Sequence, residues 1–229
     1  MRVEAPVAAI LAGGAGSRMG RDKGLLTLPD GRTACATVVE AARGAAGRVV
    51  LLVDTEEHAA RLLRALAPPL PEVLLDRDPG AGPLGSLAGA LAAVDEPALV
   101  LLAVDMPLIR PVVLRALYAR WHEVTQDAWG PAAGGTVGCI VAPVIGGMAQ
   151  PMPACYDTRL AEAAARLLAA GRRDLRALLG APEARLVPLS EGESAALDPG
   201  MGSFMGANTP DEWRAIRALH LRRDQKVGE

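Results

Sequence analysis

Two basic residues, Arg18 and Lys23, follow a glycine-rich stretch in the segment ILAGGAGSRMGRDKG, residues 10–24. Glycines let the backbone close around a ligand and turn its N–H groups inward, and the two side chains add positive charge at the same place. This combination is typical of a phosphate-binding loop. A tight strand-to-helix turn with solvated basic residues would have the same composition.

Two common phosphate loops do not fit this stretch. The dinucleotide fingerprint G-x-G-x-x-G is met at Gly14 and Gly16 but fails at Met19. A Walker A loop requires Gly-Lys-Ser/Thr, whereas Lys23 precedes a glycine. The residues therefore point to a phosphate group without indicating a dinucleotide or a P-loop protein.

Asp105 is the candidate metal ligand, because it lies in the most apolar predicted strand, residues 98–107. Ligands of open parallel sheets bind at the carboxyl ends of strands, and Mg²⁺ bound to a triphosphate uses one or two carboxylates. A turn cap before Met106 is the alternative role. Asp54 and Asp76 end two other predicted strands in the same way.

No pairing of a nucleophile with a base is visible. The three histidines lie in predicted helices away from these motifs. The three cysteines are widely spaced, without a CxxC pair, and are expected to be small buried residues. This absence is compatible with chemistry on phosphate groups, because a phosphate monoester is already largely dianionic near neutral pH and can act without a general base. Positioning and charge neutralisation are then the main tasks.

The elements that must position these residues alternate along the first half of the chain. Apolar runs predict strands at 7–13, 48–54, 72–76 and 98–107, and helices are predicted at 35–47, 55–67, 85–94 and 110–124. This order indicates a single three-layer α/β/α domain with a mostly parallel, Rossmann-like sheet.

The second half has a different rhythm. Short strands and loops are expected at 129–153, two helices at 159–180 and an irregular loop at 190–203. Thr209, Pro210 and Glu212 predict the start of a final helix, 209–223. We expect one domain over 1–223, with a nucleotide-binding half (1–124), an acceptor-binding half (125–223) and a tail (224–229).

The motifs resemble those of the molybdenum cofactor guanylyltransferases, the MobA family. The glycine-rich segment is similar to the L-A-G-G-x-x-x-R-M-G-x-x-K motif of nucleotidyltransferases. Further similar segments are LLDRDPGAGPLGSLAGAL, LLAVDMPLI, QPMPACY and NTPDEW. The resemblance implies a nucleotide-diphospho-sugar transferase type of fold. It also implies transfer of GMP from GTP to molybdopterin, with Mg²⁺ as cofactor.

The resemblance also implies roles for individual residues. The catalytic residues would be Lys23, Arg18 and Asp105, and Asp105 would hold the metal. The nucleotide would be bound by Leu11, Ala12, Gly13, Gly14, Lys23, Asp54, Asp76, Gly82, Pro83, Leu84 and Asp105. The acceptor would be bound by Gln150, Pro151, Arg172, Arg173 and Asn208.

Two positions depart from the family pattern. Asp54 stands where the family often has Asn, and Gly206 replaces the first Asn of the N-x-N-T-P ending. An ionised Asp accepts hydrogen bonds but donates none, so its nucleotide contact differs from that of Asn. The resemblance implies that Gly206 removes one contact to the acceptor.

Other functions share these motifs. Cytidylyl transfer to molybdopterin is the nearest alternative. The LAGG of this chain resembles the guanylyl-transferring branch, whereas the cytidylyl-transferring relatives usually read LAAG. Nucleotidyl transfer to a sugar phosphate or phosphorylated polyol is another. A nucleotide-binding adaptor without catalysis is the third, although it would not need both Lys23 and Asp105.

The composition bears on partners and location. The net charge of −2 does not favour nucleic acid, and no apolar run approaches the ~20 residues of a membrane span. We expect a cytoplasmic protein that makes transient contact with other cofactor-biosynthesis proteins or with the molybdoenzymes that receive the product.

Overall fold

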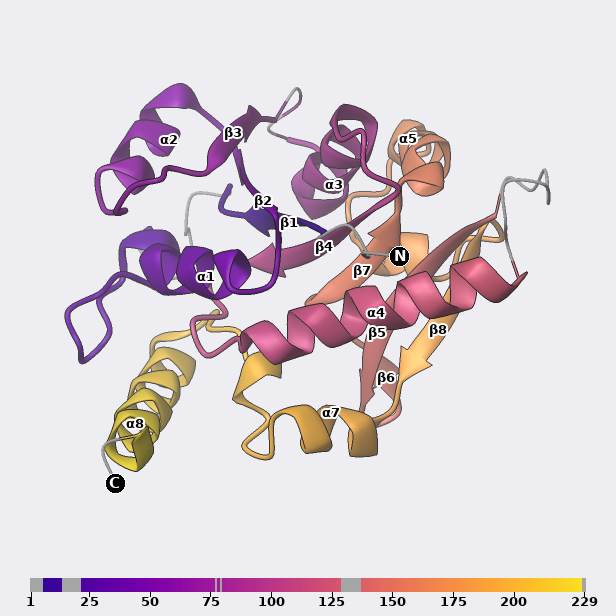
Figure 1. Ribbon diagram of the computed structural model, residues 1–229. Coiled ribbons are helices and arrows are strands. Elements are labelled where there is room, and N and C mark those ends of the chain that lie inside the picture. The colour runs from indigo at the N-terminus through magenta and orange to yellow at the C-terminus, as the bar shows by residue number, and fades with distance from the viewer. Residues whose placement is uncertain (1–5, 14–21, 77, 79, 129–136, 228–229) are drawn as a thin grey trace.

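The computed structural model describes residues 6–13, 22–76, 78, 80–128 and 137–227. Its eight-stranded sheet has the order β3-β2-β1-β4-β7-β5-β6, with β8 paired to β5. Helices cover both faces of the sheet, which confirms the expected three-layer architecture (Figure 1). The strands are β1 Val7–Leu11, β2 Arg48–Val53, β3 Glu72–Leu75, β4 Ala98–Ala103, β5 Gly138–Ile145, β6 Met148–Ala149, β7 Ala154–Asp157 and β8 Ala184–Leu189.

The first half of the sheet is parallel. Strand β1 pairs with β2 and β4, and β2 pairs with β3, all in the same direction. Every residue of β1 and β4 is buried, as expected for continuous apolar runs covered on both faces. The carboxyl ends of these strands therefore lie along one edge.

The second half is mostly antiparallel. Strand β7 pairs antiparallel with β4 and β5, and β5 pairs antiparallel with β6 and parallel with β8. The predicted change of rhythm after residue 125 thus corresponds to a change of strand direction. Strand β8 was not expected, because Pro188 and several exposed residues interrupt its apolar pattern.

The helices differ from the predicted ones mainly at their ends. Helix α3 begins at Gly82 rather than residue 85, because Pro83 fits the first turn of a helix. The predicted loop at 190–203 is wrong. Ser190 and Glu193 form a capping box that starts α7. The helices are α1 Ala34–Arg43, α2 Glu56–Leu63, α3 Gly82–Ala93, α4 Pro111–Ala128, α5 Ala161–Ala169, α6 Arg176–Leu179, α7 Glu191–Leu197 and α8 Pro210–Val227.

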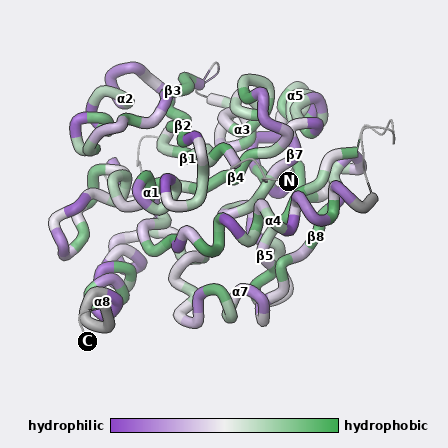
Figure 2. Tube along the Cα trace, viewed as in Figure 1, coloured by the Kyte–Doolittle hydropathy of each residue, from purple (hydrophilic) through white to green (hydrophobic). Residues whose placement is uncertain are grey.

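Two apolar clusters pack the helices against the two faces of the sheet. One cluster joins β1 to α1, α2 and α4, and the other joins the opposite face of β1 to α3, α5 and α6. Figure 2 shows hydrophobic segments along the sheet and hydrophilic segments on outward-facing turns such as those of α2. The sheet is thereby held as a rigid base for the loops at its carboxyl edge. In the part of the chain that the structure describes, no helix is both long and apolar enough to cross a membrane.

Helix α8 packs against a third, smaller apolar cluster, which includes Leu28, Leu108 and Trp213. Its cap is the predicted one, because the Glu212 amide donates to Thr209 Oγ1 at 3.2 Å. The helix continues through Val227, so the expected boundary at residue 223 falls inside it.

A buried histidine ties α8 to the turn before α1. His220 Nε2 lies 3.0 Å from Asp30 Oδ2, and Arg32 Nε donates to the same oxygen at 2.7 Å. Partial burial opposes ionisation of Asp30. The hydrogen bonds from Arg32 and His220 outweigh it and lower the pKa of Asp30 to about 2.

Candidate active site

Lys23 and Asp105 form an ion pair at the carboxyl edge of the parallel strands. Lys23 Nζ lies 2.7 Å from Asp105 Oδ2, and the two side chains are 21% and 16% exposed. Asp105 follows β4, and the Val104 amide before it donates to the Leu11 carbonyl at 2.9 Å. The predicted metal ligand and the predicted catalytic lysine therefore meet where the sequence placed them.

Lys23 opens a short 3-10 helix, η1 (Lys23–Leu25), whose N-cap is Asp22. Asp22 Oδ1 accepts a hydrogen bond from the Gly24 amide at 3.0 Å. Gly24 is buried, and a Cβ there would lie 2.7 Å from Leu62 Cδ2. Close packing of this turn on the core fixes the position from which the lysine side chain extends.

Asn208 joins the same pair from the C-terminal end of the chain. Its Oδ1 accepts a hydrogen bond from Lys23 Nζ at 2.8 Å. The amide of Ala207, one residue earlier, donates to the Asp105 carbonyl at 3.1 Å. A Cβ on Gly206 would lie 3.2 Å from Asp105 Oδ1. The segment thus contacts both charged residues, and the absence of a side chain at Gly206 lets the backbone lie close to the carboxylate.

The ends of β1, β2 and β3 lie beside this cluster. A Cβ on Gly13 would lie 3.3 Å from the Asp54 nitrogen and 3.4 Å from Asp76 Oδ2, so the backbone passes close to both. Ser86 Oγ donates to Asp76 Oδ2 at 2.8 Å. Gly13, Asp54 and Asp76, three of the predicted nucleotide-binding residues, are brought together.

Asp76 has a perturbed acidity. Burial raises its pKa above the ordinary value, the hydrogen bond from Ser86 lowers it, and the charges of Asp54 and Asp78 raise it. The net shift is upward. Perturbed carboxyl groups at a strand edge are typical of binding sites. An ionised carboxylate here would accept hydrogen bonds from hydroxyl or amino groups of a ligand.

His58 lies between two acidic residues of this site. Its Nδ1 is 2.6 Å from Asp54 Oδ1, and its Nε2 is 2.9 Å from Asp22 Oδ2, the second contact lacking hydrogen-bond alignment. The expectation that every histidine lies away from the motifs is therefore wrong. The signal was present, because Asp54 and His58 are four positions apart at the start of α2, after the Thr55 N-cap.

The backbone atoms around Leu11 and Ala12 serve the sheet. Both side chains are buried, and the amides of Ala12 and Gly13 donate to the Leu52 carbonyl at 2.9 and 3.0 Å. Inward-facing N–H groups for a phosphate would thus have to come from later residues of the loop. The predicted Gly14 and Arg18 lie outside the described residues.

Gly82, Pro83 and Leu84 form the first turn of α3 rather than a loop. The Leu84 amide donates to the Arg173 carbonyl at 3.1 Å, and a Cβ on Gly82 would lie 3.0 Å from that oxygen. Gly82 has a φ of +65°, which a residue with a side chain rarely adopts. A predicted nucleotide-side motif and a predicted acceptor-side residue are therefore neighbours.

The side chains of the predicted acceptor arginines turn toward their own segment. Arg172 Nη2 pairs with Asp174 at 2.9 Å, and Arg173 Nη1 donates to the Leu168 carbonyl at 2.9 Å. Gln150 Nε2 donates to the Met148 carbonyl at 3.1 Å, and the Pro151 carbonyl accepts from the Tyr156 hydroxyl at 2.7 Å. In the described part of the chain, the hydrogen bonds and ion pairs of these four residues do not reach the Lys23–Asp105 pair.

The cysteines are buried, as expected. Burial raises the pKa of Cys35 to about 12 and that of Cys139 to about 11, and it also raises the pKa of Cys155. Thiols that stay protonated are poor nucleophiles.

The residues around Asp105 fit a metal that is shared with a substrate. Among the described residues, no three His, Cys, Asp or Glu side chains are grouped to hold an ion by themselves. Mg²⁺ in phosphate-transfer sites needs only one or two carboxylates, with phosphate oxygens and water completing its shell. The partly buried carboxylate of Asp105 meets this requirement.

Comparison with known proteins agrees with this geometry. The family model of the MobA-like NTP transferase domain matches residues 8–186. A relative from Chloroflexus aggregans, named "Probable molybdenum cofactor guanylyltransferase", is 32% identical over 218 residues, which cover 91% of this chain and 92% of that protein. A relative of the same name from Mycobacterium tuberculosis is 36% identical over 196 residues, with 82% and 88% coverage.

The fold is also similar to that of a solved structure. Molybdopterin-guanine dinucleotide biosynthesis protein A from Archaeoglobus fulgidus superposes with a TM-score of 0.76 at 23% identity, covering 94% of this chain and 99% of that one. The family model and the curated relatives together identify the class of protein as a nucleotidyltransferase. The chain belongs to the MobA-like NTP transferase family.

Proposed function

We propose that the protein transfers GMP from GTP to the phosphate of molybdenum-bound molybdopterin, releases pyrophosphate and forms the guanine dinucleotide cofactor. The observation that carries this proposal is the convergence of Lys23, Asp105 and Asn208 at the carboxyl edge of the sheet. The names of the relatives over most of the chain support the choice of substrates.

The chemistry requires charge neutralisation more than proton transfer. An oxygen of the acceptor phosphate attacks the α-phosphorus of GTP, a new P–O bond forms, and the bond to the β-phosphate breaks to release pyrophosphate. A phosphate monoester is already largely dianionic near neutral pH, so no general base is needed. Lys23 would stabilise the charge that develops on the α-phosphate and the departing pyrophosphate. Arg18 is proposed for the same task.

Asp105 would hold Mg²⁺, and the ion would neutralise the triphosphate when both are bound. In the described structure Lys23 is paired with Oδ2 of Asp105. Lys23 would therefore exchange this carboxylate for a phosphate when the nucleotide and metal enter. Before the substrate binds, the positive charge of Lys23 would neutralise the carboxylate of Asp105.

The acidic residues favour guanine over cytosine. Asp54 and Asp76 lie beside Gly13, and ionised carboxylates are acceptor-only groups. Guanine presents N–H donors on its pairing edge, whereas cytosine presents two acceptors and one amino group. The ribose hydroxyls could use the same acceptors. Gly82, Pro83 and Leu84 would form the wall beside the base or ribose.

The acceptor side is proposed to include Asn208, Gln150, Pro151, Arg172 and Arg173. Asn208 has the most direct support, because it contacts Lys23. Arg173 lies against Gly82 through its carbonyl, which joins the acceptor half to the nucleotide half. The arginine side chains would have to leave their present partners to meet an anionic pterin.

We also propose a cytoplasmic location and transient contacts with the proteins that supply the acceptor or receive the product. These contacts follow from the chemistry, because the substrate and the product are cofactors that other proteins make and use.

Pyrophosphate release by the purified protein tests the proposed function. The assay contains Mg²⁺, the molybdopterin-type cofactor and GTP, CTP or ATP in separate reactions. Release with GTP alone, with formation of a dinucleotide, supports guanylyl transfer. Release with CTP alone retains the mechanism but refutes the proposed base. If folded protein releases no pyrophosphate with any of the nucleotides, the proposal that molybdopterin is the acceptor is refuted. Asp105→Ala is the matched variant, and near-normal turnover in it contradicts the role of Asp105.

A further inference from the structure

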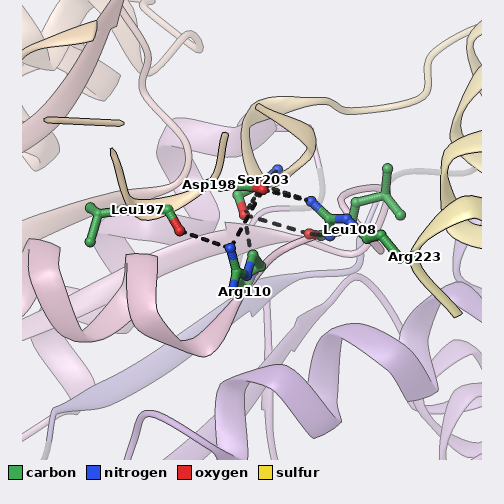
Figure 3. Close-up of polar contacts among 6 residues, drawn as sticks. All are labelled: Leu108, Arg110, Leu197, Asp198, Ser203 and Arg223. Atoms are coloured by element: carbon green, nitrogen blue, oxygen red, sulfur yellow. Dashed lines mark hydrogen bonds and ion pairs between the residues drawn. The ribbon is translucent and has the colours of Figure 1, made fainter. Parts of the chain in front are cut away.

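Asp198, at the end of α7 in the loop that leads to α8, carries a buried carboxylate to which no sequence motif assigns a role. The residue is 3% exposed. Its Oδ2 accepts hydrogen bonds from the Ser203 amide, the Ser203 hydroxyl and Arg223 Nη2, each at 2.7 Å. Figure 3 shows these side chains converging on the carboxylate. A buried charge must be satisfied in this way to be tolerated.

Arg110 and Arg223 extend the cluster to the turn that follows β4. The Arg110 amide donates to Ser203 Oγ at 3.1 Å, and Arg110 Nη1 donates to the Leu197 carbonyl at 2.9 Å. Arg223 Nη1 donates to the Leu108 carbonyl (Figure 3). The cluster thus fastens the loop to the chain segment that carries Asp105.

The loop inside this cluster has a constrained backbone. Met201 has a φ of 51°, in the left-handed region that residues with side chains rarely adopt. A Cβ on the next residue, Gly202, would lie 2.6 Å from Arg223 Nη2, so the guanidinium packs directly on the backbone. Such a conformation persists only when its surroundings impose it.

The constrained loop leads directly to Asn208. After Ser203 the chain passes Gly206 and Ala207, and the Ala207 amide donates to the Asp105 carbonyl at 3.1 Å. Asn208 then contacts Lys23. The segment is therefore held at both ends, by the Asp198 cluster at Ser203 and by Asp105 at Ala207.

We propose that Arg223, Asp198 and Ser203 position Asn208 against Lys23. Arg223 is thereby a positioning residue for nucleotidyl transfer to the acceptor. The acceptor part of this inference rests on the proposed function. Among the described residues, the hydrogen bonds and ion pairs of these three do not include Lys23 or Asp105. Their influence passes through the backbone from Ser203 to Asn208.

Arg223 is not needed to attach α8 to the domain. The helix is also held by Trp213 and Ile216 in the third apolar cluster and by the contact between His220 and Asp30. Loss of the guanidinium should therefore loosen the loop while the helix stays docked. This separation makes a positioning role distinguishable from a purely structural one.

The main test compares Arg223→Met with Arg222→Met. Met keeps an apolar stem of similar length and lacks the guanidinium, and Arg222 is the exposed neighbour on the same helix. In the pyrophosphate assay we expect Arg223→Met to lower kcat/KM for the acceptor by about tenfold or more. We expect KM for GTP to change by less than about twofold, and Arg222→Met to have no effect. Equal losses for both substrates, or no loss, would overturn the proposal.

A double-mutant cycle with Asn208→Ala tests whether Arg223 acts through Asn208. If it does, Arg223→Met should change kcat/KM by less than about twofold once Asn208 is absent, because the contact it supports is gone. If the two losses multiply, the residues act independently and the proposal fails. Partial rescue by Arg223→Lys is expected, since a lysine restores one charge without the paired geometry.

Hydrogen exchange supplies a readout that needs no activity. Arg223→Met should speed exchange of the Ala207 amide by about tenfold, with exchange in β1 and β4 unchanged. Ser203→Ala, which removes only a hydroxyl, repeats the test if the first variant does not fold. Faster exchange without any guanylyl transfer by the wild type would refute the proposed function and leave the positioning role intact. Unchanged exchange at Ala207 in the folded variants would refute the positioning role.

Discussion

Replacement of His58 by leucine should destabilise the protein by about 2–4 kcal/mol, although no substrate touches this residue in the proposed site. His58 is nearly buried, with 6% of its side chain exposed, and it separates the carboxylates of Asp22 and Asp54. Leucine has a similar volume, so packing changes little. The penalty arises because two acidic groups lose the imidazole between them.

The magnitude follows from the two contacts. A hydrogen bond to a charged group contributes about 1.5–3 kcal/mol, and the 2.6 Å contact with Asp54 is of this kind. The 2.9 Å contact with Asp22 lacks hydrogen-bond alignment and contributes less, about 0.5–1 kcal/mol. The resulting range of about 2–4 kcal/mol is centred below the roughly 3–5 kcal/mol of fully buried pairs, because the carboxylates are 16% and 23% exposed.

Urea unfolding measures the change directly. A loss of 3 kcal/mol corresponds to a fall in Tm of about 6–12 °C for a domain of this size. His122→Leu, on the surface of α4, is the matched control and should change stability by less than about 0.5 kcal/mol. Adding Asp54→Asn to His58→Leu should recover about 1 kcal/mol, since a neutral amide is less costly to bury than a carboxylate. An unchanged stability in His58→Leu, or no recovery in the double variant, would refute the electrostatic reasoning.

Three further predictions follow from the site and its supports. Lys23→Ala should lower kcat by about 10²–10³ in single-turnover assays, and Lys23→Arg should not restore it, so a loss below about tenfold contradicts the role of the ammonium. Gly24→Ala should cost about 1–3 kcal/mol in denaturant unfolding, because the new Cβ would lie 2.7 Å from a core leucine. Its control, Gly89→Ala in open space on α3, should stabilise by about 0.5–1 kcal/mol, and the opposite order would refute the packing argument. The pKa of Asp30, about 2 against an ordinary 3.8, means that its contribution is present above pH 3.8 and is lost as pH falls toward 2. The fall in the free energy of unfolding between pH 3.8 and 2 should therefore be smaller in Asp30→Asn than in the wild type, by about 1 kcal/mol after allowance for solvent screening. The same fall in both proteins would contradict this.

The parallel half of the fold was predictable, because its signals are local. Uninterrupted apolar runs bounded by glycine or a polar residue mark β1, β2 and β4, and strand direction follows from the helices between them. The place of Asp105 followed from the same logic, since it comes just after the carboxyl end of β4, whereas its ion pair with Lys23 was not predicted.

The remaining features depend on contacts between distant segments. His58 was overlooked because its second partner, Asp22, is brought to it only by the fold. In the sequence Asp198 looks like an ordinary loop aspartate, because its partner Arg223 is 25 positions away and reaches it only in the fold. The missed helix α7 is different, because its capping box at Ser190 and Glu193 is a local signal that the glycines and prolines nearby obscured.

The contact between Asn208 and Lys23 has a consequence for how the protein is made. The two residues are 185 positions apart, so the ribosome synthesises one long before the other. At about 5–20 residues per second, a chain that has just reached Asp105 needs roughly 5–20 s to reach Asn208. Lys23 and Asp105 are thus present on the nascent chain first, and Asn208 joins them only when the C-terminal segment has been made and has docked. A chain that stops early carries the lysine and the aspartate without the residue that completes them.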